Sequence, residues 1–476
     1  MAVTARERKL LVAGEWIETG AWQEVRSPFS GEVAGRVPKA GAGETRRAVD
    51  AAEQAMEAPL PAHRRAEILE RTAELVAERH EEIARTISDE AGKPMKAARV
   101  EAERAASTYR SAAVEARTLA GEMVPMDGSP AGTGKLGFTV RVPIGVVGAI
   151  SPFNFPFNLV AHKVAPALAA GCAVVLKPAS QTPLSALLLA ELETEAGLPP
   201  GWLNVVVGPA AEIGDVLVED ERVRLISFTG SAEVGWKLRG RAATKKVLLE
   251  LGNATPVIVE ADADVAGAAA KVAANAFSFA GQSCISVQRV YVQRGVYDEF
   301  VSNLVPRVEG LTVGDPADEE TDVGPVIDED ARERILAWIE EAKGQGATVL
   351  TGGETTGEGL IRPTVLAGVT PEMKVSCLEV FGPLCTVTPY DSFAEALELA
   401  NGTEYGLQAG VFTSNVQTAL AAGLGLEFGG VLVNEAPTFR ADQMPYGGVK
   451  ASGNTKEGPP YSVREMTEER LVAISL

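Results

Sequence analysis

Four polar residues at the ends of apolar stretches could together carry out chemistry on a carbonyl group. Cys284 follows Gly-Gln-Ser, and its thiolate would be a nucleophile. Asn154 follows GVVGAIS within PFNFP, where its side-chain amide could donate to an oxyanion. Lys177 ends AVVLK and Glu250 ends KVLLE, so both would stand at strand ends. Their co-occurrence favours a functional site over four unrelated structural residues.

The group that activates Cys284 is the first question that this set raises. A cysteine protease or transferase would need a histidine base. His63 and His80 lie in a charged amphipathic stretch and are most simply solvated, whereas His162 is ambiguous. Without a histidine, a helix N-terminus or a bound cation could favour the thiolate, and Gly281 permits a tight turn before it. GQSC on its own is better explained as a buried structural thiol, so its assignment depends on the other residues.

The segments around these residues predict two successive α/β bodies. Two long helical stretches come first, and a Gly/Pro-rich hairpin leaves the main body at 121–142. Strand-like and helix-like stretches then alternate from GVVGAIS to KVLLELG, and again from TPVIVE to GGVLVN. Parallel sheets of this kind bind ligands at the carboxyl ends of their strands. Because Cys284 lies near the start of the second body, we expect a site between the two.

Composition excludes several classes of function. The chain has 476 residues and a formal net charge of −20, which disfavours nucleic acid as a partner. No stretch approaches the roughly 20 apolar residues of a membrane span, and the N-terminus lacks a signal-peptide core. The four cysteines show no paired spacing, which argues against a disulfide framework or a metal site. We therefore expect a cytoplasmic protein without a metal ion.

Seven segments resemble the NAD(P)-dependent aldehyde dehydrogenases, in their order and at their spacings. The segments are PFNFP, LKPAS, FTGSAEVG, ELGNATP, FSFAGQSCISVQR, EVFGP and PYGGVKASG. The resemblance covers nearly the whole chain, and it is strongest to the branch with lactaldehyde, glyceraldehyde-3-phosphate and phosphonoacetaldehyde dehydrogenases. It implies an α/β fold of two doubly wound Rossmann-like domains with a small β oligomerisation element, and a homodimer or homotetramer. The implied domains are a cofactor-binding domain at 1–120 and 143–252, a catalytic domain at 253–455, and an oligomerisation element at 121–142 and 456–476.

The resemblance also implies a mechanism. The Cys284 thiolate attacks the aldehyde carbon, and the Asn154 amide and the Cys284 backbone N–H hold the resulting oxyanion. Glu250 acts as general base for the Cys284 thiol and, after hydride transfer to NAD or NADP, for the water that hydrolyses the thioester. A catalytic role is also implied for Lys177. The cofactor contacts that the resemblance implies are Lys177, Ser180, Gly230, Ser231, Gly235, Leu251, Glu379 and Phe381.

Two positions depart from the family pattern. Asn253 follows Gly252 where a second glycine is usual, and because asparagine occupies left-handed backbone more readily than most residues, we expect the loop to survive. Ser180 occupies the position of a glutamate that repels the 2′-phosphate of NADP in NAD-preferring members. We therefore expect both NAD and NADP to serve as cofactor.

Four basic residues suggest a substrate class. His162, Arg440, Arg110 and Arg289 fall in segments near the aldehyde tunnel of the family. Together they could form a cationic pocket for a small aldehyde that carries a phosphonate, phosphate, sulfonate or carboxylate. A surface salt bridge is the alternative for Arg110 and a structural role for Arg289. The rival functions are a lactaldehyde-type enzyme without an anion pocket, a CoA-acylating dehydrogenase, and a non-catalytic binding protein of the same fold.

Overall fold

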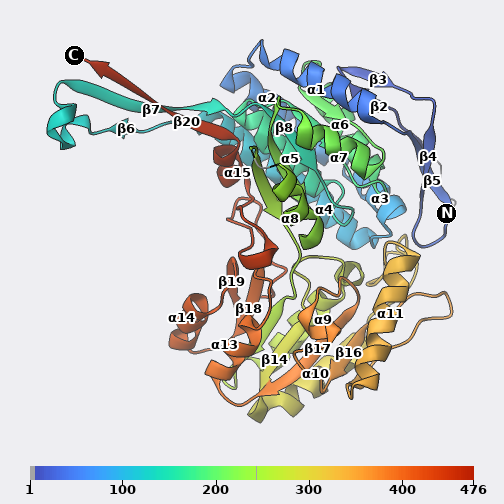
Figure 1. Ribbon diagram of the computed structural model, residues 1–476. Coiled ribbons are helices and arrows are strands. Elements are labelled where there is room, and N and C mark those ends of the chain that lie inside the picture. The colour runs from blue at the N-terminus through green and yellow to red at the C-terminus, as the bar shows by residue number, and fades with distance from the viewer. Residues whose placement is uncertain (1–5, 243) are drawn as a thin grey trace.

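The structure of the chain is a computed structural model that describes residues 6–242 and 244–476. Two bodies lie one above the other, and an arm projects from the upper one (Figure 1). Each body is built on a seven-stranded sheet, and the arm is a three-stranded antiparallel sheet. The predicted α/β class, with two mainly parallel sheets and a small β element, is confirmed.

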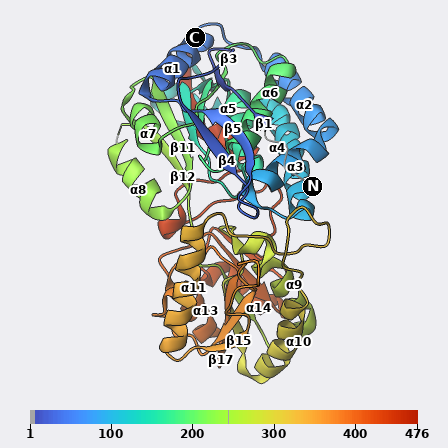
Figure 2. The ribbon, with the colours of Figure 1, turned by 90° about the vertical axis from the view of Figure 1, so that its right-hand side faces the viewer.

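The sheet of the upper body has the strand order β12-β11-β8-β9-β10-β2-β3. Its first five strands are parallel, and β2 and β3 extend it in antiparallel fashion. Helices cover both faces (Figure 2), because the strands are apolar on both sides. The strands are β2 (Leu10–Val12), β3 (Glu15–Ile17), β8 (Val146–Ile150), β9 (Val174–Lys177), β10 (Leu203–Val205), β11 (Val223–Thr229) and β12 (Lys246–Glu250). The helices are α1 (Ala42–Met56), α2 (Ala62–Glu78), α3 (His80–Ala91), α4 (Met95–Thr118), α5 (Asn158–Ala170), α6 (Pro183–Glu195), α7 (Ala210–Glu219) and α8 (Ala232–Arg241).

The sheet of the lower body has the order β15-β16-β17-β14-β13-β18-β19. All its pairs are parallel except β15 with β16. Its strands are β13 (Pro256–Val259), β14 (Arg289–Gln293), β15 (Thr348–Thr351), β16 (Thr364–Ala367), β17 (Leu384–Tyr390), β18 (Gln408–Phe412) and β19 (Gly430–Val433). Its helices are α9 (Val265–Ala276), α10 (Tyr297–Glu309), α11 (Glu329–Gly344), α12 (Lys374–Cys377), α13 (Phe393–Asn401) and α14 (Val416–Gly425).

The arm joins a mid-chain hairpin to the C-terminal segment. β20 (Thr467–Ser475) pairs with β7 (Lys135–Pro143) along its whole length, and β7 pairs with β6 (Met123–Val124). The preceding helix α15 (Pro459–Glu465) packs against α4 and α5 instead, with Val463 in the upper core. Only the last part of the C-terminal segment therefore joins the hairpin, which differs from the expected boundary at residue 456.

Two further features differ from the sequence prediction or extend it. A small sheet of β1 (Arg6–Glu7), β5 (Val33–Pro38) and β4 (Trp22–Arg26) was not predicted, since its strands are short and polar. In the described part of the chain, no helix combines the length and the apolar character that crossing a membrane requires.

Candidate active site

Two cavities between the bodies meet at Cys284. We call the first the arginine cavity; it has a volume of about 370 Å³ and is lined by Arg104, Arg440 and Glu250, among others. The second, the strand-end cavity, measures about 860 Å³ and lies at the carboxyl ends of β8 and β11. Cys284 lines both cavities, together with Leu159, Thr229 and Leu251. The thiol thus stands where two ligands bound in the two cavities would meet.

A left-handed turn presents Cys284 to the cavities. Phe279, Ala280 and Gly281 all have positive φ, and a Cβ atom at Gly281 would lie 2.1 Å from the carbonyl oxygen of Gly382. Cys284 itself lies in a turn and does not begin a helix. In residues 6–242 and 244–476, no hydrogen bond uses the Cys284 backbone N–H, which leaves it available to an oxyanion.

The thiol of Cys284 has one side-chain partner. Its Sγ lies 2.8 Å from the hydroxyl oxygen of Tyr446. Burial raises the pKa of the thiol to about 12, while the Tyr446 hydrogen bond and the charge of Arg440 act in the opposite direction. The thiol is therefore protonated in the structure as it stands, and ionisation needs help from its surroundings.

Glu250 is the last residue of β12, and its carboxyl group has no hydrogen-bond partner among the described residues. Both its carboxylate oxygens are buried, and neither has a hydrogen bond within the described residues. Burial, and then the negative charge of Glu457, raise the pKa of Glu250 well above its usual value. A Cβ atom at Gly447 would lie 2.6 Å from Glu250 Oε1, so only glycine lets that loop approach so closely. An unpaired carboxyl group with a raised pKa is suited to take up and release protons.

Asn154 lies against the Cys284 loop. Its Nδ2 donates to the backbone oxygen of Gln282 at 3.0 Å, and its buried Oδ1 has no partner among the described residues. Lys93 is fully buried and donates to the Asn154 backbone oxygen at 2.6 Å. Lys93 also pairs with Glu101, which accepts from the backbone N–H groups of Phe157 and Asn158. These contacts hold the Asn154 loop in place beside the thiol.

A buried charge cluster lies behind the arginine cavity. Arg440 pairs with Glu457 at 3.0 Å, and Lys163 approaches the same carboxylate at 3.5 Å. Arg104 pairs with Asp442 at 2.9 Å. We call these five residues the charge cluster; its three cations face two carboxylates, which leaves one positive charge in excess.

His162 contacts this cluster but does not line the cavity. Its Nε2 lies 3.1 Å from Asp442 and 3.2 Å from an Arg440 nitrogen. Burial and the Arg440 charge lower the pKa of His162 to about 4, so the ring is neutral near pH 7. His162 therefore supports Arg440 and adds no charge.

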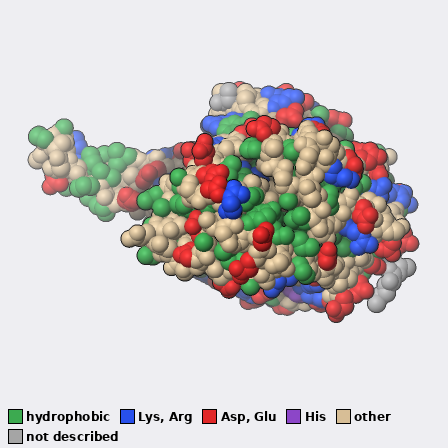
Figure 3. Space-filling model, turned by 90° about the horizontal axis from the view of Figure 1, so that it is seen from below, with side chains coloured by type: hydrophobic (Ala, Val, Ile, Leu, Met, Phe, Trp, Pro, Cys, Tyr) green, Lys and Arg blue, Asp and Glu red, His purple; other side chains and the backbone are tan. Residues whose placement is uncertain are grey.

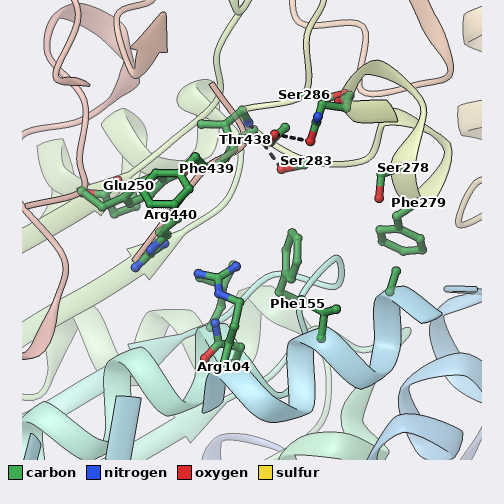
Figure 4. Close-up of a pocket in the computed structure, with 18 of the residues that line it drawn as sticks. Arg104, Phe155, Glu250, Ser278, Phe279, Ser283, Ser286, Thr438, Phe439 and Arg440 are labelled. Carbon is green, nitrogen blue, oxygen red and sulfur yellow. Dashed lines mark hydrogen bonds between the residues drawn. The ribbon is translucent and has the colours of Figure 1, made fainter. Parts of the chain in front are cut away.

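Two of the predicted pocket residues are corrected by the structure. Arg110 is exposed on α4 and lies outside the cavity, whereas Arg104, six positions earlier, lines it. Six residues turn a helix through about 240° beyond one full turn, so the two side chains point in different directions. Arg289 is buried in β14, where it donates to the backbone oxygens of Ala254, Leu399 and Ala400. Its role is structural. Figure 4 shows Arg104 and Arg440 reaching the same space from different elements.

The strand-end cavity is built to hold a dinucleotide. Gly230 and Ser231 line it at the N-terminus of α8, where backbone N–H groups favour a phosphate. Glu379, Phe381 and Leu251 line its other side. Glu379 is buried, and its pKa is raised to about 7 by that burial. The size of the cavity, its polar groups and its place at the strand ends fit NAD or NADP.

Three predicted cofactor residues lie outside the lining of this cavity. Lys177 ends β9 and is largely buried, and desolvation lowers its pKa. The Ser180 hydroxyl donates to the backbone oxygen of Gly208 at 3.4 Å. A Cβ atom at Gly235 would lie 2.5 Å from Leu251, so this glycine lets α8 approach Leu251 closely.

Asn253 keeps ordinary backbone and does not use the left-handed conformation that asparagine tolerates. Asn253 is not among the residues with positive φ. Its Nδ2 donates to Thr255 at 2.8 Å and to the Gln408 backbone oxygen at 3.0 Å, and its backbone N–H donates to Glu379. The buried asparagine side chain thus links two segments by hydrogen bonds, and its backbone N–H positions the Glu379 carboxylate.

Sequence reasoning missed Arg104, Tyr446, Glu457 and Lys163. The helix NLVAHKVAPALAA carried a usable signal, because Lys163 interrupts a run that is otherwise almost entirely apolar. Tyr446 and Glu457 carried no such signal in the sequence. They reach the site through a loop, and an antiparallel bridge between their backbones holds the two residues side by side.

Comparisons with known proteins agree along the whole chain. The model of the aldehyde dehydrogenase family matches residues 16–472. A 3-sulfolactaldehyde dehydrogenase of Priestia megaterium is 46% identical over 98% of each chain. The NADP-dependent succinate-semialdehyde dehydrogenase of Escherichia coli is 40% identical, again over 98% of each chain. The crystal structure of aldehyde dehydrogenase 21 from Physcomitrella patens in complex with the reaction product succinate has a TM-score of 0.95, with 39% identity and 99% coverage of each chain.

Proposed function

The chain belongs to the aldehyde dehydrogenase family, and from this premise we propose that its substrate is a short aldehyde with a singly charged anionic tail. The protein oxidises an aldehyde to a carboxylic acid with NAD or NADP. The finer proposal concerns the tail, for which a sulfonate or a carboxylate is the best candidate. It rests on one observation: Arg104 and Arg440 line the same small cavity as Cys284.

The residues of this chain divide the reaction among them. Cys284 attacks the aldehyde carbon, and its backbone N–H and the Asn154 amide hold the oxyanion. Gly230, Ser231, Glu379 and Phe381 of the strand-end cavity would hold NAD or NADP, which would supply the hydride acceptor. Glu250 takes a proton from the water that cleaves the thioester, and the thiol is restored. The catalytic domain at 253–455 supplies Cys284, while β12 of the first domain supplies Glu250.

Charge supports a monoanionic tail. The charge cluster has one positive charge in excess, because Arg104, Arg440 and Lys163 face only Asp442 and Glu457, and His162 is neutral near pH 7. One surplus charge balances a sulfonate or carboxylate but not a doubly charged phosphate or phosphonate. The two reported relatives are named for sulfolactaldehyde and succinate semialdehyde, which carry such tails. They lend no support to a phosphonate.

A lactaldehyde-type substrate without an anion is the second candidate. The observation that favours it is that Arg104 and Arg440 already have the carboxylate partners Asp442 and Glu457. If these pairs satisfy both arginines, the cavity recognises only the shape of a short aldehyde.

Replacing Arg104 separates the two candidates. We expect Arg104→Gln to raise KM for an aldehyde with a sulfonate or carboxylate tail by about tenfold to a hundredfold, since it removes a charge-assisted contact. KM for propionaldehyde should change little. The measurement is initial-rate kinetics with both cofactors.

Arg110→Gln is the matched control, because it removes the same charge from an exposed position of the same helix. It should leave both KM values unchanged. Equal effects of Arg104→Gln on KM for charged and neutral aldehydes would contradict the proposal of an anionic tail. The lactaldehyde-type substrate would then be the better candidate.

We also propose that the arm joins copies of the chain into a homodimer or homotetramer. Leu471 and Ile474 are exposed on β20, Leu136 on β7, and Leu476 directly after β20. Figure 3 shows hydrophobic side chains along the arm. Such exposed strands invite pairing with another copy.

Sedimentation velocity should give at least twice the chain mass of 49.9 kDa. Leu471→Glu, which places a charge on the apolar strand, should shift the equilibrium toward monomers. A wild-type mass near 49.9 kDa at micromolar concentration would contradict the assignment.

A further inference from the structure

Tyr446 is a buried phenol whose hydroxyl contacts the nucleophile. Its side chain is nearly inaccessible, with 3% exposure, and its hydroxyl oxygen lies 2.8 Å from Cys284 Sγ. Across residues 6–242 and 244–476, no other group forms a hydrogen bond with this hydroxyl. A buried hydroxyl is costly without a partner, so the contact with the thiol satisfies a requirement of the fold.

The position of Tyr446 is held from three sides. Its backbone N–H donates to the backbone oxygen of Glu457 at 3.1 Å. The Arg440 guanidinium lies over its ring, 3.9 Å from the ring centre, and fixes the plane of the phenol. A Cβ atom at Gly448 would lie 2.5 Å from Ser452, so the loop after Tyr446 is tightly folded. The hydroxyl is thus preorganised toward the sulfur.

The direction of the hydrogen bond depends on the state of the thiol. While Cys284 is protonated, either atom can donate. Once Cys284 is a thiolate, it has no hydrogen to give, so only Tyr446 can donate. Burial raises the pKa of Tyr446 well above its usual value, so it keeps its hydrogen throughout. A donor that binds the charged form more strongly than the neutral form favours ionisation.

We propose that Tyr446 is a further catalytic residue, which donates its hydroxyl hydrogen to the Cys284 thiolate and so favours the nucleophilic form. No bond of Tyr446 breaks in this role; the thiol proton leaves to the carboxylate of Glu250, which lines the same cavity, and the hydroxyl remains a donor. The inference rests on the proposed role of Cys284 as the nucleophile. It gives the Cys284 thiolate a hydrogen-bond donor within its own site.

The test is the pH dependence of thiol alkylation in the full-length protein without cofactor. Iodoacetamide reacts with the thiolate, and mass spectrometry resolves the modified cysteines. We expect Tyr446→Phe to raise the apparent pKa of Cys284 by about one unit, which lowers its alkylation rate near neutral pH about tenfold. Tyr461→Phe, which changes a half-exposed tyrosine on α15, should change nothing.

An unchanged or lowered pKa of Cys284 in Tyr446→Phe would overturn the proposal. Cys377 is partly exposed and serves as the internal reference, while modification of the buried Cys172 and Cys385 would reveal loss of the fold. If Tyr446→Phe does not fold, Tyr446→3-fluorotyrosine decides. Its more acidic hydroxyl is a stronger donor, so it should lower the pKa of Cys284, and no decrease would overturn the proposal.

The measurement does not depend on aldehyde turnover. An unchanged thiol pKa in Tyr446→Phe would count against Tyr446 alone. Persistence of aldehyde oxidation after removal of Cys284 would count against the proposed nucleophile.

Discussion

Aldehyde oxidation by the Cys284→Ser variant should fall by at least about 10⁴-fold in kcat/KM, because the thiol that lines both cavities is replaced by a far less acidic hydroxyl. The serine hydroxyl can still hydrogen-bond to Tyr446, so the buried phenol keeps a partner and the fold should survive. Affinity for NAD and NADP should change little. Initial-rate kinetics give the activity, and fluorescence titration gives the cofactor affinities.

Cys377→Ser is the matched control. Cys377 is partly exposed at the end of α12 and lines neither cavity. Its replacement should leave kcat/KM within about threefold of wild type, as expected for a thiol that contacts no reacting atom. A Cys284→Ser variant that kept more than about a hundredth of the activity would contradict the assigned nucleophile.

The Glu250→Gln variant should release its product about 10²-fold to 10⁴-fold more slowly, the contribution that a positioned general base usually makes. The amide has the size of the carboxylic acid but cannot take a proton from water. If Cys284 still ionises, one equivalent of reduced cofactor should form quickly and turnover should then stop. Stopped-flow absorbance measures the burst, and mass spectrometry of the quenched enzyme detects the acyl group on Cys284.

The pH dependence of kcat provides a second measurement of the same role. Because burial and Glu457 raise the pKa of Glu250, its base form grows only as the pH rises through that raised pKa. The wild-type kcat should therefore increase with pH through this range, and the profile of Glu250→Gln should be flat.

Stability gives the control for Glu250→Gln. The folded-state pKa of Glu250 lies above its unfolded value, so the folded state loses stability as the pH rises between the two. The neutral glutamine avoids that loss, and the variant should unfold at no lower temperature than wild type near pH 8. Glu435→Gln, at another carboxylate of the arginine cavity, should keep full activity because Glu435 pairs with Lys271. Full turnover by Glu250→Gln would contradict the assignment of Glu250 as the general base.

The positions of the principal catalytic residues could be predicted from local patterns. Asn154 and Glu250 follow strands of one parallel sheet, and the carboxyl ends of parallel strands meet at one edge. Cys284 lies in the connection between β13 and β14, a parallel pair of the next sheet, shortly before β14 begins. The alternation of apolar strands and helices along the chain determines this arrangement. The positions of these residues could therefore be predicted without knowing any contact between distant parts of the chain.

The substrate pocket depended on contacts that no local pattern describes. Arg104 and Arg110 lie on one helix and are similar in sequence context, yet only the packing of α4 on α5 decides which faces the cavity. Arg289 is the first residue of β14 and is buried, and its guanidinium donates to three backbone oxygens of other segments.

What the sequence by itself determined is the fold, the family and the strand-end residues of the reaction, because periodicity and turn residues act over a few positions. The tertiary structure alone decided which charges face the substrate and what accompanies the thiol. Tyr446 meets Cys284 across 162 positions, and Lys163 meets Glu457 across 294. Such pairs depend on how the two bodies pack and on the path of one loop. The residues next to a side chain in the sequence do not determine either of these.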